Sequence, residues 1–201
     1  MKVLFAVVIG YLLGSVPFAL VIGKIFYKKD IRQFGSGNLG GSNAGRVLGK
    51  KAGLSVMALD LLKVTLAIWI ASLLDPQDAV LTAAGVAAAA GHCFPVFAKF
   101  KGGKAVATMY GFLFGMALIG EYSFWIFFFP LIAFLVILYV TKIVSVSSML
   151  SAAADTIFIY VTTDSKELFW GALIFTVLMI LRHKSNIERI FKHQENKIKW
   201  M

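Results

Sequence analysis

The sequence predicts an all-α integral membrane protein, a compact bundle of about seven transmembrane helices that forms one domain over residues 1–201. Hydrophobic residues make up 59% of the chain and charged residues only 15%, whereas soluble domains are near half apolar and a quarter charged. The apolar residues gather in long runs separated by short polar loops. This composition excludes a soluble nucleic-acid-binding protein, and the single cysteine excludes an intrachain disulfide.

Seven segments approach the roughly 20 apolar residues that cross about 30 Å of hydrocarbon. They cover residues 3–22, 53–74, 79–97, 105–120, 122–140, 143–161 and 168–181. Pro17 interrupts the first, which we expect to be a retained helix, kinked or broken there, because no small-residue cleavage site follows it. The fourth and seventh are short, and Glu121 alone separates the fourth from the fifth, so five to seven spanning helices is the expected range.

The distribution of basic residues predicts how the chain is oriented in the membrane. The chain has 20 Lys and Arg against 10 Asp and Glu, a net charge of +10. When the loops are assigned to alternate sides of the membrane, 17 of these 20 basic residues fall on one side. The positive-inside rule places that side in the cytoplasm, with the N-terminus outside and the C-terminus inside.

Small and charged residues within the segments predict helix contacts. The stretch 79–90 is mostly alanine, and Gly111 with Gly115 forms a small-xxx-small pair that allows close approach. Asp60 and Lys63 are three apart and should pair, for function or for structure with equal weight. Asp155 has no partner nearby in the sequence and should face the bundle interior. No internal repeat supports a transporter built from inverted halves.

A glycine-rich loop at 35–46 follows the first segment. It contains G-x-G-x-x-G, but no strand precedes it, so we reject a dinucleotide site. Glycines permit positive φ, successive backbone N–H groups can form an anion-binding nest, and a guanidinium can grip phosphate at two points. A flexible connector is the alternative, and the pattern favours phosphate. The candidate residues are Ser36, Gly37, Asn38, Gly40, Gly41, Asn43 and Arg46.

A second polar loop runs from 91 to 104. Its Lys101-Gly102-Gly103-Lys104 lacks the rest of a P-loop, so nucleotide binding is not supported. A Gly pair before a helix still offers free N–H groups and a positive dipole end to an anion, and we favour a phosphate role for Lys104. For His92, a partner role at the helix C-terminus outweighs an acid or base role.

A third basic patch, 182–189, follows the last segment, and headgroup anchoring is an equally weighted alternative there. His183 and Asn186 are three apart and would share a helix face, and hydroxyls at 141–148 should lie at the same membrane side. Neither a G-x-S-x-G elbow nor a His followed five positions later by Asp is present. With three His and one Cys, we expect no metal and no cofactor.

Four stretches carry a family resemblance: residues 14–18, 35–43, 91–108 and 182–189. Together they closely resemble the PlsY family of bacterial acyl-phosphate:glycerol-3-phosphate acyltransferases, over essentially the whole chain, and the third stretch is the most specific. The chain departs from the family's usual residues at Ser42, Ala105, Lys142 and Lys184 and lacks a Gly near His193. The last departure leaves the role of the tail around Glu195 open.

The resemblance implies an acyltransferase of the bacterial inner membrane with its active site on the cytoplasmic side. It would transfer a fatty acyl group from long-chain acyl phosphate to the 1-hydroxyl of glycerol-3-phosphate, giving lysophosphatidate and inorganic phosphate, the first step of phospholipid synthesis. Acyl-CoA and acyl carrier protein would not serve as donors. The expected partners are these two substrates and membrane lipid, and a monomer is the working expectation.

An acyl phosphate is a mixed anhydride with a good leaving group, so we expect direct attack without an acyl-enzyme. The proton would pass to His183 or to a substrate phosphate. The alternative function is a small membrane carrier or binding protein for an organic phosphate. We assign as catalytic Ser36, Asn38, Lys104, His183 and Asn186. We assign as substrate-binding Gly37, Gly40, Gly41, Asn43, Arg46, His92, Gly102, Gly103, Lys142, Ser145 and Arg182.

Overall fold

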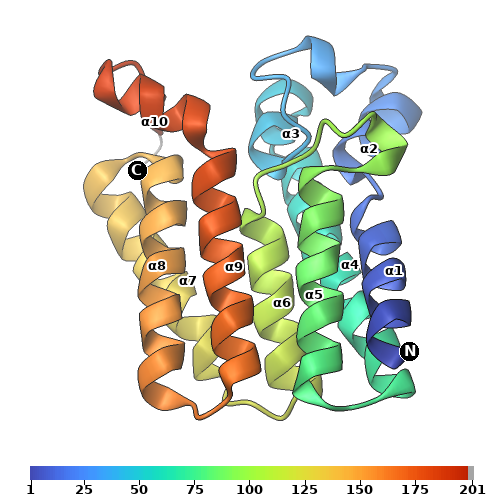
Figure 1. Cartoon of the computed structure of the whole chain (residues 1–201). Coiled ribbons are helices and arrows are strands. Elements are labelled where there is room, and N and C mark those ends of the chain that lie inside the picture. Colours follow the sequence, from blue (N-terminus) through green and yellow to red (C-terminus); the bar gives the residue numbers. More distant parts are fainter. Residues whose placement is uncertain (199–201) are drawn as a thin grey trace.

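The computed structural model describes residues 1–198, and within them it contains helices and no strand. Figure 1 shows the long helices lying side by side as a bundle. In chain order the helices are α1 (Lys2–Gly14), α2 (Phe18–Tyr27), α3 (Gly41–Leu48), α4 (Lys50–Leu74), α5 (Asp78–Cys93), α6 (Val106–Ile119), α7 (Trp125–Thr141), α8 (Val144–Thr162), α9 (Lys166–Arg182) and α10 (Lys184–Phe191). Two short 3₁₀ turns are η1 (Ile31–Gln33) and η2 (Val96–Ala98).

The two ends of the bundle differ in what they carry. The short helices α2, α3 and α10 and the long connection from α5 to α6 gather at one end, which we call the site end (Figure 1). The N-terminus and the connections 75–77, 120–124 and 163–165 lie at the other end. The three glycine-rich or basic stretches predicted from the sequence therefore lie at the same end of the molecule.

All seven predicted apolar segments are helical, and the chain is an all-α membrane protein as predicted. The first segment breaks at Pro17, between α1 and α2, which also confirms the sequence prediction. Four helices are long and apolar enough to span a membrane: Lys2–Tyr27 taken through its break, α4, Asp78–Ala98 and α8. The pair α9 and α10, bent by 57°, would make a fifth, and α6 and α7 are shorter apolar helices. The figure of seven crossings stays a prediction.

Close contacts between small residues place the α1–α2 break against α5. A Cβ atom on Gly10 or Gly14 would overlap the α5 backbone at Ala84 or Ala88. One on Gly91 would overlap the backbone near the end of α1. The alanine-rich stretch therefore does serve close packing, and it fixes the helix break next to the end of α5 that carries a predicted site residue.

On α6, the predicted small-xxx-small pair likewise faces α4. A Cβ on Gly111 would overlap the backbone of Leu61, and one on Gly115 would press on Ile68. Asp155 is only 1% exposed, and its Oδ1 has no hydrogen-bond partner among residues 1–198, so it faces the interior as predicted.

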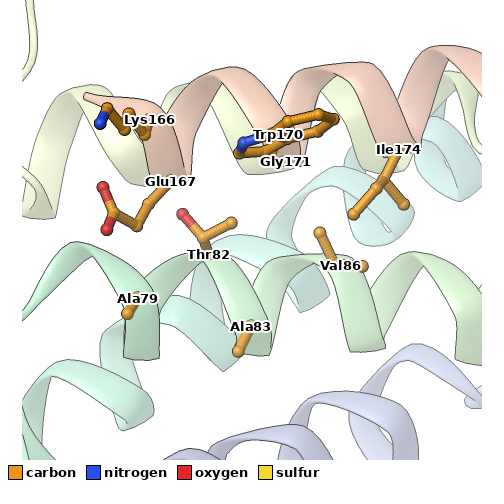
Figure 2. Close-up of a pocket in the computed structure, with 9 residues that line it drawn as sticks. All are labelled: Ala79, Thr82, Ala83, Val86, Lys166, Glu167, Trp170, Gly171 and Ile174. Atoms are coloured by element: carbon orange, nitrogen blue, oxygen red, sulfur yellow. The ribbon is translucent and has the colours of Figure 1, made fainter. Parts of the chain in front are cut away.

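A cavity of about 320 Å³ lies between α5 and α9 (Figure 2). Lys166 and Glu167 stand at the N-terminal end of α9, beside Ala79 and Thr82 of α5. These residues belong to the start of both helices, at the end opposite the glycine-rich loops. No predicted site residue lines this cavity.

Candidate active site

The first loop is organised by Asn43. Its amide nitrogen donates to the carbonyl oxygens of Phe34 and Asn38, at 3.2 and 3.0 Å, and its oxygen accepts from the Ser36 amide at 2.9 Å. The side chain is 2% exposed and all its polar atoms are used by the loop itself. The structure therefore gives Asn43 a loop-shaping role, and the backbone amides of Ser36, Gly37 and Gly40 in the predicted anion nest already have partners within the protein.

Asn38 joins the first loop to the second. Its oxygen accepts from the Gly40 amide at 2.9 Å, and its nitrogen donates to the Gly102 carbonyl at 3.3 Å. Arg182, from the end of α9, donates to the same Gly102 carbonyl at 3.1 Å and to that of Gly103 at 3.0 Å. Two stretches far apart in the sequence, the first loop and the end of α9, thus converge on Gly102 and Gly103.

Gly102 and Gly103 pack against His92. The Gly103 amide donates to the His92 carbonyl at 3.0 Å. A Cβ on Gly103 would overlap the His92 ring, and one on Gly102 would overlap the His92 carbonyl oxygen. The loop needs glycine at both positions because it lies directly on the last turn of α5.

His92 is in turn tied to the predicted pair on α4. Lys63 Nζ lies 2.7 Å from Asp60 Oδ1 and 3.1 Å from His92 Nδ1, and it donates to the Val16 carbonyl at 3.0 Å. Asp60, Lys63 and His92 are 1%, 4% and 6% exposed. The ion pair expected from the i,i+3 spacing is present, with a histidine and the carbonyl at the α1–α2 break as further partners.

Lys104 follows the two glycines and reaches across to α10. Its ammonium donates to Asn186 Oδ1. The Asn186 nitrogen donates to Glu195 Oε1 at 2.5 Å, which also accepts from Ser145 Oγ at 2.8 Å. Arg189 Nε donates to the other carboxylate oxygen at 2.7 Å. Glu195 can only accept, so the contacts fix the Asn186 amide with its oxygen towards Lys104.

The site is cationic. Burial, first of all, and then the guanidinium of Arg189 lower the pKa of Lys104 to about 8. Arg182 and Arg46 lower the same pKa further, and the Glu195 carboxylate partly offsets them. Burial raises the pKa of Glu195, but the hydrogen bonds from its three partners outweigh burial and hold that pKa below its ordinary value. The cationic cluster thus consists of Lys104, Arg182 and Arg189 with the Glu195 carboxylate, which binds Arg189, and Arg46 adds to its positive charge.

His183 stands at the junction of α9 and α10 and is 3% exposed. Its Nδ1 lies 2.8 Å from the Met179 carbonyl oxygen, which can only accept, so Nδ1 carries the proton. In the neutral ring Nε2 is then an acceptor. His183 and Asn186 lie in one turn, because the Asn186 amide donates to the His183 carbonyl at 2.8 Å.

Other predicted site residues lie apart or serve packing. Ser36 and Arg46 are exposed, and Arg46 acts on the cluster through its charge. The Lys142 ammonium lies 4.2 Å from the Tyr139 ring centroid, and no side-chain hydrogen bond joins it to the cluster.

A Cβ on Gly41 would overlap Met57 on α4, so this glycine permits the contact between α3 and α4. Gly37 has φ of 67°, which favours glycine.

Sequence reasoning missed Glu195 as a site residue. Its partners lie 6, 9 and 50 residues away, so no local motif shows that they meet. The available signal was an acidic residue set in the basic stretch after the last apolar segment. Asp60 and Lys63 were identified as a pair, but their contact with His92 depends on how α4 packs against α5.

The fold and the site define the class: an all-α integral membrane protein whose polar network is concentrated at one end of the bundle. The family model for glycerol-3-phosphate acyltransferase matches residues 4–193. This chain belongs to that family and is an acyltransferase.

Relatives and solved structures agree. The glycerol-3-phosphate acyltransferase of Bacillus subtilis is 43% identical over the full length of both chains. That of Geobacillus kaustophilus is 46% identical, covering 96% of this chain and 94% of the relative. The crystal structure of PlsY (YgiH), an integral membrane glycerol 3-phosphate acyltransferase in its glycerol 3-phosphate form, superposes with a TM-score of 0.90 at 36% identity, covering 99% of this chain and 96% of that one. Its lysophosphatidic acid form gives a TM-score of 0.88.

Proposed function

We propose that this protein transfers a fatty acyl group from acyl phosphate to the 1-hydroxyl of glycerol-3-phosphate and releases lysophosphatidate and inorganic phosphate. The observation that carries the proposal is the cationic cluster around Lys104, at the site end of an otherwise apolar bundle. Both substrates bear phosphate and one bears a long apolar chain, so they need cations beside lipid-accessible surface. The two crystallised forms of the related PlsY, with glycerol 3-phosphate and with lysophosphatidic acid, support this substrate and product.

The reaction proceeds by direct attack. The 1-hydroxyl oxygen of glycerol-3-phosphate forms a bond to the acyl carbonyl carbon, the bond from that carbon to the phosphate oxygen breaks, and inorganic phosphate leaves. The hydroxyl proton passes to the departing phosphate, whose second pKa near 6 suits it, or to His183 Nε2. Lys104 and the neighbouring guanidinium groups offset the phosphate charges, as groups fixed before the reaction begins.

Three side chains that could form an acyl-enzyme lack the surroundings of an activated nucleophile. Cys93 is fully buried in α5, and the buried Ser145 Oγ donates to Glu195, whose pKa is held low by its hydrogen-bond partners. Ser36 is exposed, and no side-chain hydrogen bond among the described residues joins its hydroxyl to a base. The Asn186 oxygen accepts from Lys104 and one of its N–H groups donates to Glu195, so we assign this side chain to holding Lys104 in place. Attack on the mixed anhydride itself therefore fits the site better than a two-step route.

The site end faces the cytoplasm of a bacterial inner membrane in this proposal, because the basic residues concentrate there. Its substrates would then enter from the cytoplasm and from the inner leaflet.

Purified protein with labelled glycerol-3-phosphate and either palmitoyl phosphate or palmitoyl-CoA tests the donor. We expect labelled lysophosphatidate with palmitoyl phosphate alone, and release of one inorganic phosphate per product. Product from palmitoyl-CoA at an equal rate would contradict the donor assignment. Trapping of acylated protein after quenching would contradict direct attack.

A further inference from the structure

We propose that Asp60 and Lys63 are positioning residues of the acyl-transfer site that act through His92 on the loop carrying Lys104. The proposal rests on the proposed function, in that it takes Lys104 as the phosphate-binding group. Neither Asp60 nor Lys63 touches the cationic cluster, and both are buried on α4. Their effect must therefore pass through a chain of contacts.

Lys63 uses all its donors. An ammonium has three N–H groups and no acceptor, and Lys63 Nζ has three partners: Asp60 Oδ1, the Val16 carbonyl and His92 Nδ1. His92 Nδ1 also lies 3.5 Å from Asp60 Oδ1, but the ammonium is closer, at 3.1 Å. We therefore assign Nδ1 as the acceptor, which places the ring proton of neutral His92 on Nε2. The Nε2 edge of that ring is the part that a Cβ on Gly103 would strike.

His92 passes this constraint to the loop in two ways. Its carbonyl accepts from the Gly103 amide at 3.0 Å, and its ring lies under the Gly103 Cα. Lys104 is the next residue. A shift or flip of the imidazole would therefore displace the backbone from which the Lys104 side chain extends. Misplacement by about 1 Å can cost a hundredfold in rate, so a small displacement is enough.

Asp60 holds the Lys63 ammonium in place, and the Val16 carbonyl adds the α1–α2 break to the network. At this break the Leu20 amide donates to the Pro17 carbonyl, so the Val16 carbonyl, which accepts from the Phe18 amide at 3.2 Å, can also accept from Lys63 on α4. The network thus ties α2, α4 and α5 to one loop, and it resembles the supporting shell that fixes a reactive group on rigid elements.

The test is the double variant Asp60→Asn/Lys63→Met, which removes both charges together and leaves no buried charge unpaired. We expect this variant to fold. Its KM for glycerol-3-phosphate, measured with the acyl donor that supports turnover, should be at least about tenfold higher than that of the wild type. The matched control is Thr156→Val/Thr176→Val, another buried polar pair, joined at 2.9 Å between α8 and α9. The control should keep the wild-type KM.

Cys93 supplies a readout that is independent of activity. It is the only cysteine, it is fully buried, and it adjoins His92. We expect N-ethylmaleimide to label it about ten times faster in Asp60→Asn/Lys63→Met than in the wild type or the threonine control, because the loop over it opens locally. Faster labelling with no acyl transfer by the wild type would refute the proposed function alone.

A folded Asp60→Asn/Lys63→Met protein with wild-type KM and a protected Cys93 would show that the pair is only structural and overturn the proposal. If Asp60→Asn/Lys63→Met does not fold, the variant His92→Asn tests the proposal in its place. Asparagine retains an acceptor for Lys63 but lacks the ring beneath Gly103. An unchanged KM and unchanged Cys93 labelling in His92→Asn would equally overturn the proposal.

Discussion

Lys104 is the residue at which burial, charge and position coincide. It follows two glycines that are fixed by three other stretches of chain, and its ammonium is held by an asparagine whose orientation a carboxylate sets. Its pKa of about 8 leaves it mostly charged at neutral pH. A lysine here is a compact point charge rather than a planar fork, so it does not demand one bidentate orientation of the phosphate that it binds.

Lys104→Ala should lower kcat/KM by about 10² to 10³, or roughly 3 to 4 kcal/mol, because it removes a fixed cation from the reacting phosphate. The fold should persist, since Lys104 lies in a loop between α5 and α6. The measurement is lysophosphatidate formation together with thermal unfolding in detergent. Lys101→Ala, at an exposed position three residues earlier, is the control and should retain activity. Full turnover in Lys104→Ala would remove the basis of the proposed site.

The same lysine predicts an alkaline limit. The ammonium binds phosphate only while protonated, and its lowered pKa of about 8 means that the proton is lost as pH rises through 8. We expect KM for glycerol-3-phosphate to be flat below that pH and to rise about tenfold per unit well above it. In Lys104→Arg the guanidinium stays charged, so the rise should disappear from whatever activity remains. Identical profiles for both proteins up to pH 9.5 would contradict this.

Local sequence placed Lys104, His183 and Asn186 in polar stretches beside apolar segments, and the structure brings these three residues together. Their catalytic roles stay predictions. The substrate-binding roles of Asn43 and Gly41 also stay predictions, and in the structure their contacts shape and pack the loop. Asparagine and glycine occur in the same sequence pattern whether a loop binds an anion or only closes on itself. Only the contacts of these residues in the structure distinguish the two roles.

Among the elements, the C-terminal segment after α10 folds back onto the site, which no sequence periodicity predicted. It turns back so that Glu195 meets α8 through Ser145 and α10 through Asn186 and Arg189. The Ile198 amide also donates to the Lys142 carbonyl at 2.9 Å. The tail is therefore part of the site's support. The apolar helices themselves were predictable, because hydrocarbon demands long apolar runs whatever their partners.

Glu195→Gln should weaken this support. The amide is neutral, and if its oxygen keeps the hydrogen bonds from Ser145 and Asn186, its NH₂ group faces the Arg189 guanidinium and cannot accept from it. Hydrogen bonds to charged groups contribute about 1.5 to 3 kcal/mol each, so kcat/KM should fall at least tenfold and the melting temperature should drop. Glu188→Gln changes an exposed carboxylate on α10 and is the matched control. Wild-type activity and melting temperature in Glu195→Gln would show that the tail is dispensable.

The whole molecule separates its charges by end. Ion pairs and hydrogen bonds at the end opposite the site include Lys2 with Asp75 at 3.2 Å and Ser165 with Asp78 at 2.8 Å. The site end carries the glycine-rich loops and most basic residues. In the proposed function, this one asymmetry has two purposes: it orients the bundle in the membrane and it supplies the cations of the site. The sequence alone assigns the charges to loops, but it does not show which charges orient the bundle and which belong to the site.

Cysteine labelling tests the orientation and the number of crossings together. In a Cys93→Ala background, single cysteines replace exposed residues at the site end, Lys50 and Lys184, and at the other end, Glu121 and Asp164. An impermeant maleimide should reach the latter two in intact spheroplasts, and the former two only after the membrane is disrupted. Labelling of position 164 but not 121 from outside would mean that α6 and α7 form a re-entrant pair and leave five crossings. Labelling of positions 50 and 184 from outside would reverse the proposed orientation and place the site on the wrong side for cytoplasmic substrates.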